Sequence, residues 1–128
     1  LNAELKVSEA YKLPYKNNFF DSAMLITVLH CIKTKRKRKR ALEELYRVLK
    51  PGSEAMINVW GRNSPRIKNK PKSGFIPWTI EGKKYFRYTY IYEKKELEDL
   101  LKNVGFKIIS SKEIQNIMII VEKPSNKI

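Results

Sequence analysis

A strongly apolar segment followed by an amphipathic helix constrains the fold of this chain more than any other feature. Ala23–Leu29 is almost wholly apolar, which is typical of a central strand covered on both faces. Residues 41–49 then place apolar side chains at the 3.6-residue period of a helix. Pro51 and Gly52 predict the end of that helix, because proline cannot continue it and glycine readily takes a positive φ. A further apolar strand at Ala55–Trp60 completes the order strand, helix, strand, which predicts a parallel α/β unit.

The remaining elements extend the same sheet. Leu5–Ser8 alternates apolar and polar residues and predicts a short strand. Lys94–Val104 is a second amphipathic helix, and an aromatic-rich stretch, Lys84–Tyr92, is expected to be extended. Phe106–Ser110 and Ile117–Val121 lie close in sequence and should pair as an antiparallel hairpin. The whole pattern predicts an α/β sheet whose ligand lies at the carboxyl ends of the parallel strands.

The chain is strongly basic. It carries 27 Lys and Arg against 13 Asp and Glu, for a formal net charge of +14. A surface this positive attracts polyanions, nucleic acid above all, although a lysine-rich surface that only aids solubility stays open as an alternative. The charges concentrate in the run Lys33–Arg40 and in residues 61–74, which we expect to form a flexible basic loop. The run Lys33–Arg40 could equally be a nuclear-import address or the solvated start of a helix.

Cysteine usage and hydropathy bear on location. The lone Cys31 excludes an internal disulfide and fits a reducing compartment. No apolar run is long enough to span a bilayer. We therefore expect a cytoplasmic protein that makes no membrane contact, with the nucleus as the other possibility. One Cys and one His cannot complete a structural zinc site, so no metal is expected in the chain itself.

Several short motifs resemble those of the class I S-adenosylmethionine-dependent methyltransferases. They are Ser8-Glu9-Ala10, Leu13-Pro14-Tyr15, Phe20-Asp21 and Leu49-Lys50-Pro51-Gly52. Further stretches are similar to the tRNA wobble-uridine carboxymethyl methyltransferases, a domain also found fused to AlkB-type hydroxylases. These stretches are residues 27–32, 57–60, 76–78, 86–92 and 116–118. The resemblance implies a Rossmann-like sheet, here its strands three to seven with an antiparallel final hairpin, and S-adenosylmethionine as cofactor.

The sequence lacks the glycine-rich loop and the ribose-binding acidic residue of the resembled family. The five glycines stand at 52, 61, 74, 82 and 105, and none forms Gly-x-Gly. We therefore expect residues 1–128 to be a single incomplete methyltransferase domain that binds S-adenosylmethionine poorly alone. An upstream segment or a separate chain would supply the first strands, and the start at Leu1 rather than Met would suit a fragment. The resembled enzymes also work with a small zinc-binding activator protein.

The resembled reaction indicates what the site must do. There, a carboxylate on carboxymethyluridine attacks the sulfonium methyl, and since a carboxyl with a pKa near 4 is already ionised, no general base is required. Catalysis is then positioning, for which Arg87 is our candidate clamp and His30 our candidate at the carboxyl end of strand four. Glu9 would accept from the adenine amino group and Ala10 would leave room for the ring. The full cofactor set is Glu9, Ala10, Leu29 and His30.

The tRNA partner would contact basic and aromatic residues. Phosphates would meet the two basic segments, and bases would stack on aromatic rings. The candidates are Lys35, Arg36, Arg38, Arg62, Arg66, Trp78, Arg87, Tyr88 and Tyr92. Structural roles stay open beside these: Arg87 could face solvent, His30 could be a satisfied polar residue, and Trp78 could pack in the core.

Three functions remain open from the sequence. The first is the carboxy-terminal part of a tRNA wobble-uridine methyltransferase. The second is a non-catalytic, methyltransferase-like module that binds RNA or a partner. The third is a methyltransferase of another substrate class, against which the basic surface argues mildly.

Overall fold

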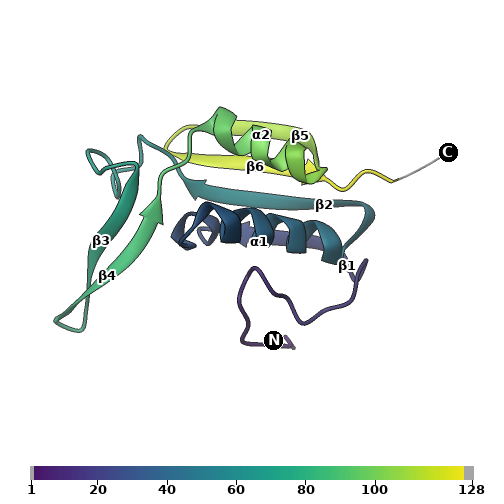
Figure 1. The fold of residues 1–128 in the computed structure, drawn as a ribbon, viewed down its shortest axis with the longest axis horizontal. Helices are drawn as coiled ribbons and strands as arrows, with labels where there is room; N and C mark the ends of the chain where they lie inside the picture. The colour runs from purple at the N-terminus through teal and green to yellow at the C-terminus, as the bar shows by residue number, and fades with distance from the viewer. Residues whose placement is uncertain (1, 126–128) are drawn as a thin grey trace.

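The computed structural model describes residues 2–125, which contain six strands and two α-helices (Figure 1). A short 3-10 helix, η1, follows the first strand. In chain order the elements are β1 (Phe20–Ile26), η1 (Leu29–Cys31), α1 (Lys35–Val48), β2 (Leu49–Trp60), β3 (Ser73–Ile80), β4 (Lys83–Tyr90), α2 (Lys94–Val104), β5 (Lys107–Glu113) and β6 (Asn116–Glu122).

Four of the strands form one sheet in the order β1-β2-β6-β5. β1 runs parallel to β2, with Ala23 opposite Ala55. β6 runs antiparallel to both β2 and β5. This confirms the predicted strand–helix–strand unit and the antiparallel final hairpin.

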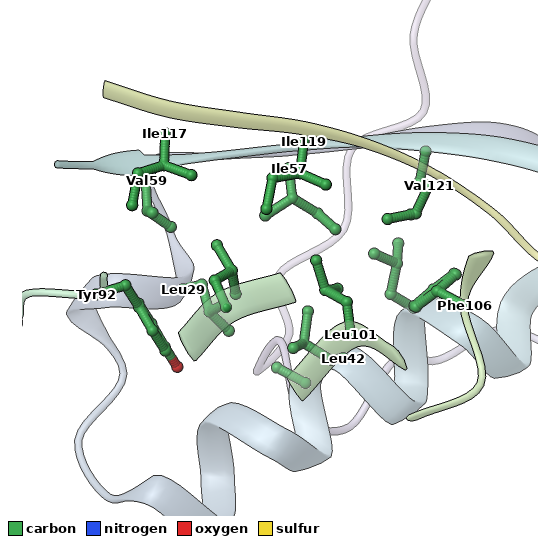
Figure 2. Packing of buried hydrophobic residues seen from close by; sticks show 14 of the residues in the cluster. Leu29, Leu42, Ile57, Val59, Tyr92, Leu101, Phe106, Ile117, Ile119 and Val121 are labelled. Atoms are coloured by element: carbon green, nitrogen blue, oxygen red, sulfur yellow. The ribbon is translucent and has the colours of Figure 1, made fainter. Parts of the chain in front are cut away.

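The hydrophobic core lies between this sheet and the two α-helices (Figure 2). Along β2 and β6 every second side chain is buried, among them Ile57 and Ile119, while Met118 on the other face is 42% exposed. Leu42 and Leu101 bring the apolar stripes of α1 and α2 against the buried face. Apolar residues that repeat every second position in the strands and every 3.6 positions in the helices thus form one shared layer.

Local chemistry sets the ends of both helices. Thr34 caps α1 by accepting a hydrogen bond from the Lys37 amide at 3.1 Å. Glu93 and Glu96 form a reciprocal capping box at the start of α2. Gly105 ends α2 with a φ of +124°, a conformation that glycine adopts most easily.

The strand predicted at Leu5–Ser8 is wrong. Leu5 and Val7 are fully solvent-exposed and lie in irregular chain. The physical reason is that a strand needs a hydrogen-bonding neighbour, and within residues 2–125 no strand lies beside this segment. The backbone of this segment therefore has no neighbouring strand with which to form hydrogen bonds, despite its alternating sequence.

β1 also differs from the expected strand Ala23–Leu29 covered on both faces. It ends at Ile26, because Thr27 takes a φ of +52° and turns the chain into η1. Among the described strands β1 pairs only with β2, so its outer edge is open. Separately, Met24 and Ile26 point to the sheet face opposite the two α-helices, the face of Met118, and are 70% and 44% exposed.

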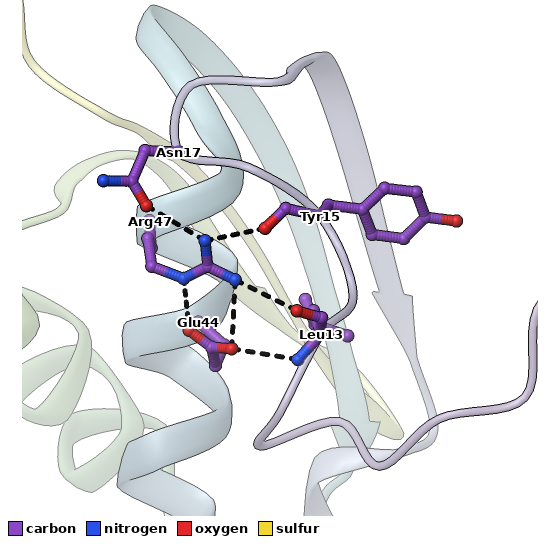
Figure 3. Close-up of polar contacts among 5 residues, drawn as sticks. All are labelled: Leu13, Tyr15, Asn17, Glu44 and Arg47. Carbon is purple, nitrogen blue, oxygen red and sulfur yellow. Dashed lines mark hydrogen bonds and ion pairs between the residues drawn. The ribbon is translucent and has the colours of Figure 1, made fainter.

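The segment before β1 is fastened to α1 by two side chains, Arg47 and Glu44 (Figure 3). The Arg47 guanidinium donates to the carbonyls of Tyr15 at 2.7 Å and Leu13 at 3.1 Å, and to the Asn17 side chain at 2.9 Å. Glu44 pairs with Arg47 and accepts from the Leu13 amide at 2.9 Å. The hydrogen bond from Arg47 is the main reason that the pKa of Glu44 is lowered. These contacts, rather than a strand ladder, position residues 13–17.

β3 and β4 form a separate two-stranded ribbon that projects from the body of the molecule (Figure 1). The predicted extended stretch corresponds to β4, but its pairing with β3 was not foreseen. Glu81 and Gly82 form the two-residue loop with φ values of +49° and +78°, as in a type I′ hairpin. Between β2 and β3, the basic loop folds back so that Ile67 is fully buried beside Trp60.

Candidate functional site

A cavity of about 600 Å³ lies at the carboxyl end of β1. The turn Thr27–Cys31 forms one wall, because the positive φ of Thr27 ends the strand there. Glu9 and Ala10 form a second wall, and Arg87 of β4 reaches the same space. The structure therefore brings together three of the predicted site residues. Arg87 lies at least 77 positions after Glu9 and Ala10 in the sequence. We call this space the main cavity.

Further side chains line the main cavity without having been singled out as site residues. Their common feature is position: they flank the predicted residues in sequence or sit on the first turn of α1. They are Ser8, Tyr11, Thr27, Val28, Cys31, Ile32, Lys33 and Lys37. Sequence reasoning had a signal for the lysines, since both belong to the basic run, but not for Thr27, whose contribution depends on its backbone turn.

A smaller cavity of about 340 Å³ adjoins the main one. Thr27 and Arg87 line both, and the smaller one adds Trp60, Trp78 and Arg66. The Arg87 guanidinium lies 4.8 Å from the ring centre of Trp78, and that of Arg66 lies 5.6 Å from Trp60. We call this space the aromatic cavity. Two aromatic faces and two cations in one place suit a flat, negatively charged group.

His30 lies beneath the aromatic cavity instead of lining it. The imidazole is only 1% exposed and stacks on Trp60, with ring centres 4.5 Å apart. Neither ring nitrogen has a hydrogen-bond partner among the described residues. Burial first, and then the charge of Arg87, lowers the pKa of His30 to about 4. The imidazole is therefore neutral near pH 7, and it supports Trp60 from behind.

Cys31 is the one nucleophilic thiol in the sequence, and it lines the main cavity. Burial raises its pKa, although the charge of Arg87 acts in the opposite direction. Since the thiolate is the reactive form, this thiol is held in its unreactive state at neutral pH.

Three of the predicted contact residues are inside the protein. Leu29 is fully buried in the core and lines neither cavity. Tyr92 is 2% exposed, and burial raises its pKa to about 12. Arg38 is 4% exposed: it donates to the Ile32 carbonyl at 2.9 Å and lies 4.0 Å from the ring centre of Tyr90. Arg38 therefore joins η1, α1 and β4 from within.

The other basic and aromatic candidates are at the surface or partly exposed. Lys35 and Arg36 are exposed on the first turn of α1. Arg62 is exposed in the basic loop and donates to the Lys70 carbonyl at 2.6 Å. Tyr88 is half-buried on β4, and its hydroxyl accepts from Arg38 at 3.4 Å.

The arrangement of the sheet and helices matches a known fold. A solved S-adenosylmethionine-dependent methyltransferase from Methanosarcina mazei superposes with a TM-score of 0.78 at 26% identity, covering 96% of this chain and 68% of that one. A family model described as "Methyltransferase domain" matches residues 1–57. The chain has the fold of the class I S-adenosylmethionine-dependent methyltransferases. The resemblance seen in the sequence motifs is thereby confirmed, as is the Rossmann-like sheet.

Among curated proteins, the chain is similar to enzymes that are named as tRNA methyltransferases. It is 40% identical to the tRNA (carboxymethyluridine(34)-5-O)-methyltransferase of Arabidopsis thaliana, over 64% of this chain and 19% of that protein. It is 27% identical to the Schizosaccharomyces pombe protein of the same name, over 80% of this chain and 56% of that protein. The chain thus spans a fifth to about half the length of these relatives.

Two further observations concern residues 2–125. No helix in this part of the chain is long and apolar enough to cross a membrane. No three His, Cys, Asp or Glu side chains in it gather closely enough to hold a metal ion.

Proposed function

We propose that this chain forms the substrate-binding part of a tRNA methyltransferase that acts on the carboxylate of a carboxymethyl-modified wobble uridine. The observation that carries the proposal is the position of Arg87. This one cation lines both the main cavity, beside Glu9 and Ala10, and the aromatic cavity, beside Trp60 and Trp78. A carboxylate held by Arg87 would lie at the junction of the two spaces.

The residues of the main cavity fit the nucleoside end of S-adenosylmethionine. The volume of about 600 Å³ falls in the range of small-molecule sites. Ala10 keeps the wall shallow for a flat ring, and the exposed carboxylate of Glu9 can accept from an amino group. When bound, the cofactor supplies an electrophilic methyl group. The methionine end would need donors beyond those of Glu9 and Ala10, which is where the family's glycine-rich loop would contribute.

The aromatic cavity would hold the uridine base and its acidic substituent. The half-buried Trp78 would contact the base, and Trp60, which is 6% exposed and stacks on His30, supports Trp78 at a ring separation of 5.8 Å. Arg87 and Arg66 would orient the carboxylate through charge-assisted hydrogen bonds. A carboxyl group with an ordinary pKa near 4 is ionised at neutral pH, so the site needs to position it and exclude water rather than remove a proton. His30 is 1% exposed and lines neither cavity, so it is not placed to act as a general base.

The open edge of the sheet supports a further proposal about partners. Met24 and Ile26 are exposed on β1, and the outer edge of β1 offers unpaired backbone groups. We infer that another segment, from the same polypeptide or a separate chain, covers this edge and completes the cofactor site. A small zinc-binding activator protein would join the complex and bring its own zinc ligands. The protein would act on tRNA in the cytoplasm, with the nucleus as the other possible site.

The Arg87→Ala variant tests the proposed function. The assay measures transfer of a radiolabelled methyl group from S-adenosylmethionine to tRNA by the complete polypeptide that carries these residues. Loss of a hydrogen-bonded charge pair is worth about 1.5–3 kcal/mol, so we expect transfer to fall at least about tenfold, with unchanged affinity for the cofactor. Arg87→Lys keeps the charge but loses the planar fork, and should recover only part of the activity.

Lys112→Ala serves as the matched control, since it removes an exposed cation from β5, away from both cavities. Equal turnover by the Arg87→Ala and Lys112→Ala proteins would remove Arg87 from the site and with it the proposal.

A further inference from the structure

The β3–β4 ribbon has two unlike faces. Cross-strand pairs share a face, so Ile76 and Arg87 point to the side of the aromatic cavity. The neighbouring pairs Phe75–Tyr88 and Pro77–Phe86 point to the other side. On that side Phe75 is 59% exposed and Phe86 is 64% exposed. We call this the outer face of the ribbon, and large exposed aromatic side chains on such a face indicate a binding surface.

The outer face leads into a third cavity, of about 640 Å³, which the proposed methyl-transfer site does not use. Tyr88 belongs to both the outer face and the cavity. The cavity lies between the end of β4, the start of α1 and one side of α2. Its lining includes Lys35, Lys39, Ser73, Tyr88, Tyr90 and Leu100. We call it the tyrosine cleft.

Positive charge accompanies this aromatic path. Lys33 Nζ lies 5.5 Å from the ring centre of Phe75, and Lys84 Nζ lies 5.6 Å from that of Phe86. Lys35 and Lys39 stand on the rim of the tyrosine cleft.

The acidic groups near the tyrosine cleft already have partners. Glu96 pairs with Lys72 at 3.1 Å and accepts from the Tyr90 hydroxyl. Asp99 pairs with Lys95 at 3.4 Å. The lysines along the path therefore face no competing free carboxylate of the cleft, and the surface complements a polyanion.

We propose that the outer face and the tyrosine cleft bind a single-stranded stretch of RNA next to the methylated nucleotide. Bases stack on Phe75, Phe86 and Tyr88, while lysines contact the phosphates. Rings spaced along one face and bordered by cations are the arrangement that binds single strands, because every base offers a stacking face. The inference rests on the proposed function only where it identifies the bound RNA as part of the tRNA that is methylated. The contact itself is distinct, since Arg87 lies on the opposite face of the ribbon.

Two eight-nucleotide probes separate base stacking from charge. One is fluorescein-labelled oligouridine, and the other is an abasic strand of the same length with the same number of phosphates. Binding to this chain is followed by fluorescence anisotropy at fixed salt. The test variant is Phe75→Ala/Phe86→Ala, whose exposed side chains can be removed without opening the core. The control is Phe19→Ala, which removes a ring that is 50% exposed and precedes β1, at the end of the strand away from η1 and the ribbon.

We expect the wild-type chain to bind oligouridine at least about tenfold more tightly than the abasic strand, from the stacking of one or more bases. The double variant should lose this preference and retain the abasic affinity, while the Phe19→Ala protein keeps both. Equal binding of the two probes by the wild-type chain, or an unchanged preference in the double variant, would overturn the proposal. So would concentration-dependent dimers that disappear in the double variant, because the face would then be a protein contact.

The Arg87→Ala protein keeps the two proposals distinguishable. It should bind oligouridine as the wild-type chain does, even though methyl transfer falls. Stacking on the outer face in a wild-type complete polypeptide that transfers no methyl group to tRNA would leave this inference standing and remove only the proposed function.

Discussion

The burial of His30 predicts a specific loss of stability in acid. Its imidazole is 1% exposed, neither nitrogen has a partner among the described residues, and burial together with Arg87 lowers its pKa from 6.5 to about 4. His30 therefore becomes protonated below about pH 6.5 in the unfolded chain, but only below about pH 4 in the folded chain. Since protons then favour the unfolded state, stability falls as the pH drops through this window.

The size of the loss follows from the pKa shift. A shift from 6.5 to about 4 corresponds, at 1.36 kcal/mol for each unit, to about 3 kcal/mol lost between about pH 7.5 and about pH 4. His30→Phe keeps an aromatic ring against Trp60 but cannot be protonated. The variant should be at least as stable as the wild-type chain at neutral pH, because it removes two buried nitrogens without partners.

Urea unfolding followed by circular dichroism at both pH values measures this effect. The lowered pKa values of Glu44, Glu96 and Glu98 also cost stability in acid, but equally in both proteins. The difference between wild type and His30→Phe therefore isolates the histidine. If the two proteins lose the same free energy of unfolding on acidification, His30 is not held neutral by burial and its assigned place behind Trp60 is wrong.

Two further predictions concern the scaffold. Arg47→Leu removes the bonds that hold residues 13–17, so the Leu13 amide should exchange with deuterium at least about tenfold faster; unchanged exchange would contradict the fastening. Gly105→Ala places a Cβ 3.1 Å from the Tyr46 ring at a φ of +124°, whereas Gly52→Ala, at +85°, meets nothing within 4 Å. Urea unfolding should show a loss of about 1 kcal/mol for Gly52→Ala and a clearly larger one for Gly105→Ala, and equal losses would exclude the Tyr46 contact.

The helices and the central strands were predictable because their side-chain periods match their burial. The bounds of α2 agree with the predicted Lys94–Val104, and the alternate residues of β6 enter the core. The strand at Leu5–Ser8 failed because alternation predicts a strand only where a neighbour exists to pair with it. No pattern within one segment contains that information.

The sequence singled out three of the residues that line the main cavity, but it did not predict how they meet. Glu9, Ala10 and Arg87 meet in one cavity, but the turn at Thr27 takes His30 away from the cavity wall. Arg38 was placed with the surface charges of the basic run. Its spacing from the buried stripe of α1, three residues before Ala41, could have indicated an inward position. The ribbon likewise had a usable signal in its Glu-Gly loop.

The attachment through Arg47 has a consequence for how the main cavity can respond to a ligand. Glu9 and Ala10 stand on a stretch of chain that is held by side-chain contacts from α1 to residues 13–17 and by the packing of Ala10, and not by interstrand hydrogen bonds like the one that holds Thr27. The two walls of the cavity therefore differ in stiffness. Entry of a flat ring would move the Glu9 side toward the rigid Thr27 side, so that closing around the adenosyl group requires no rearrangement of the sheet.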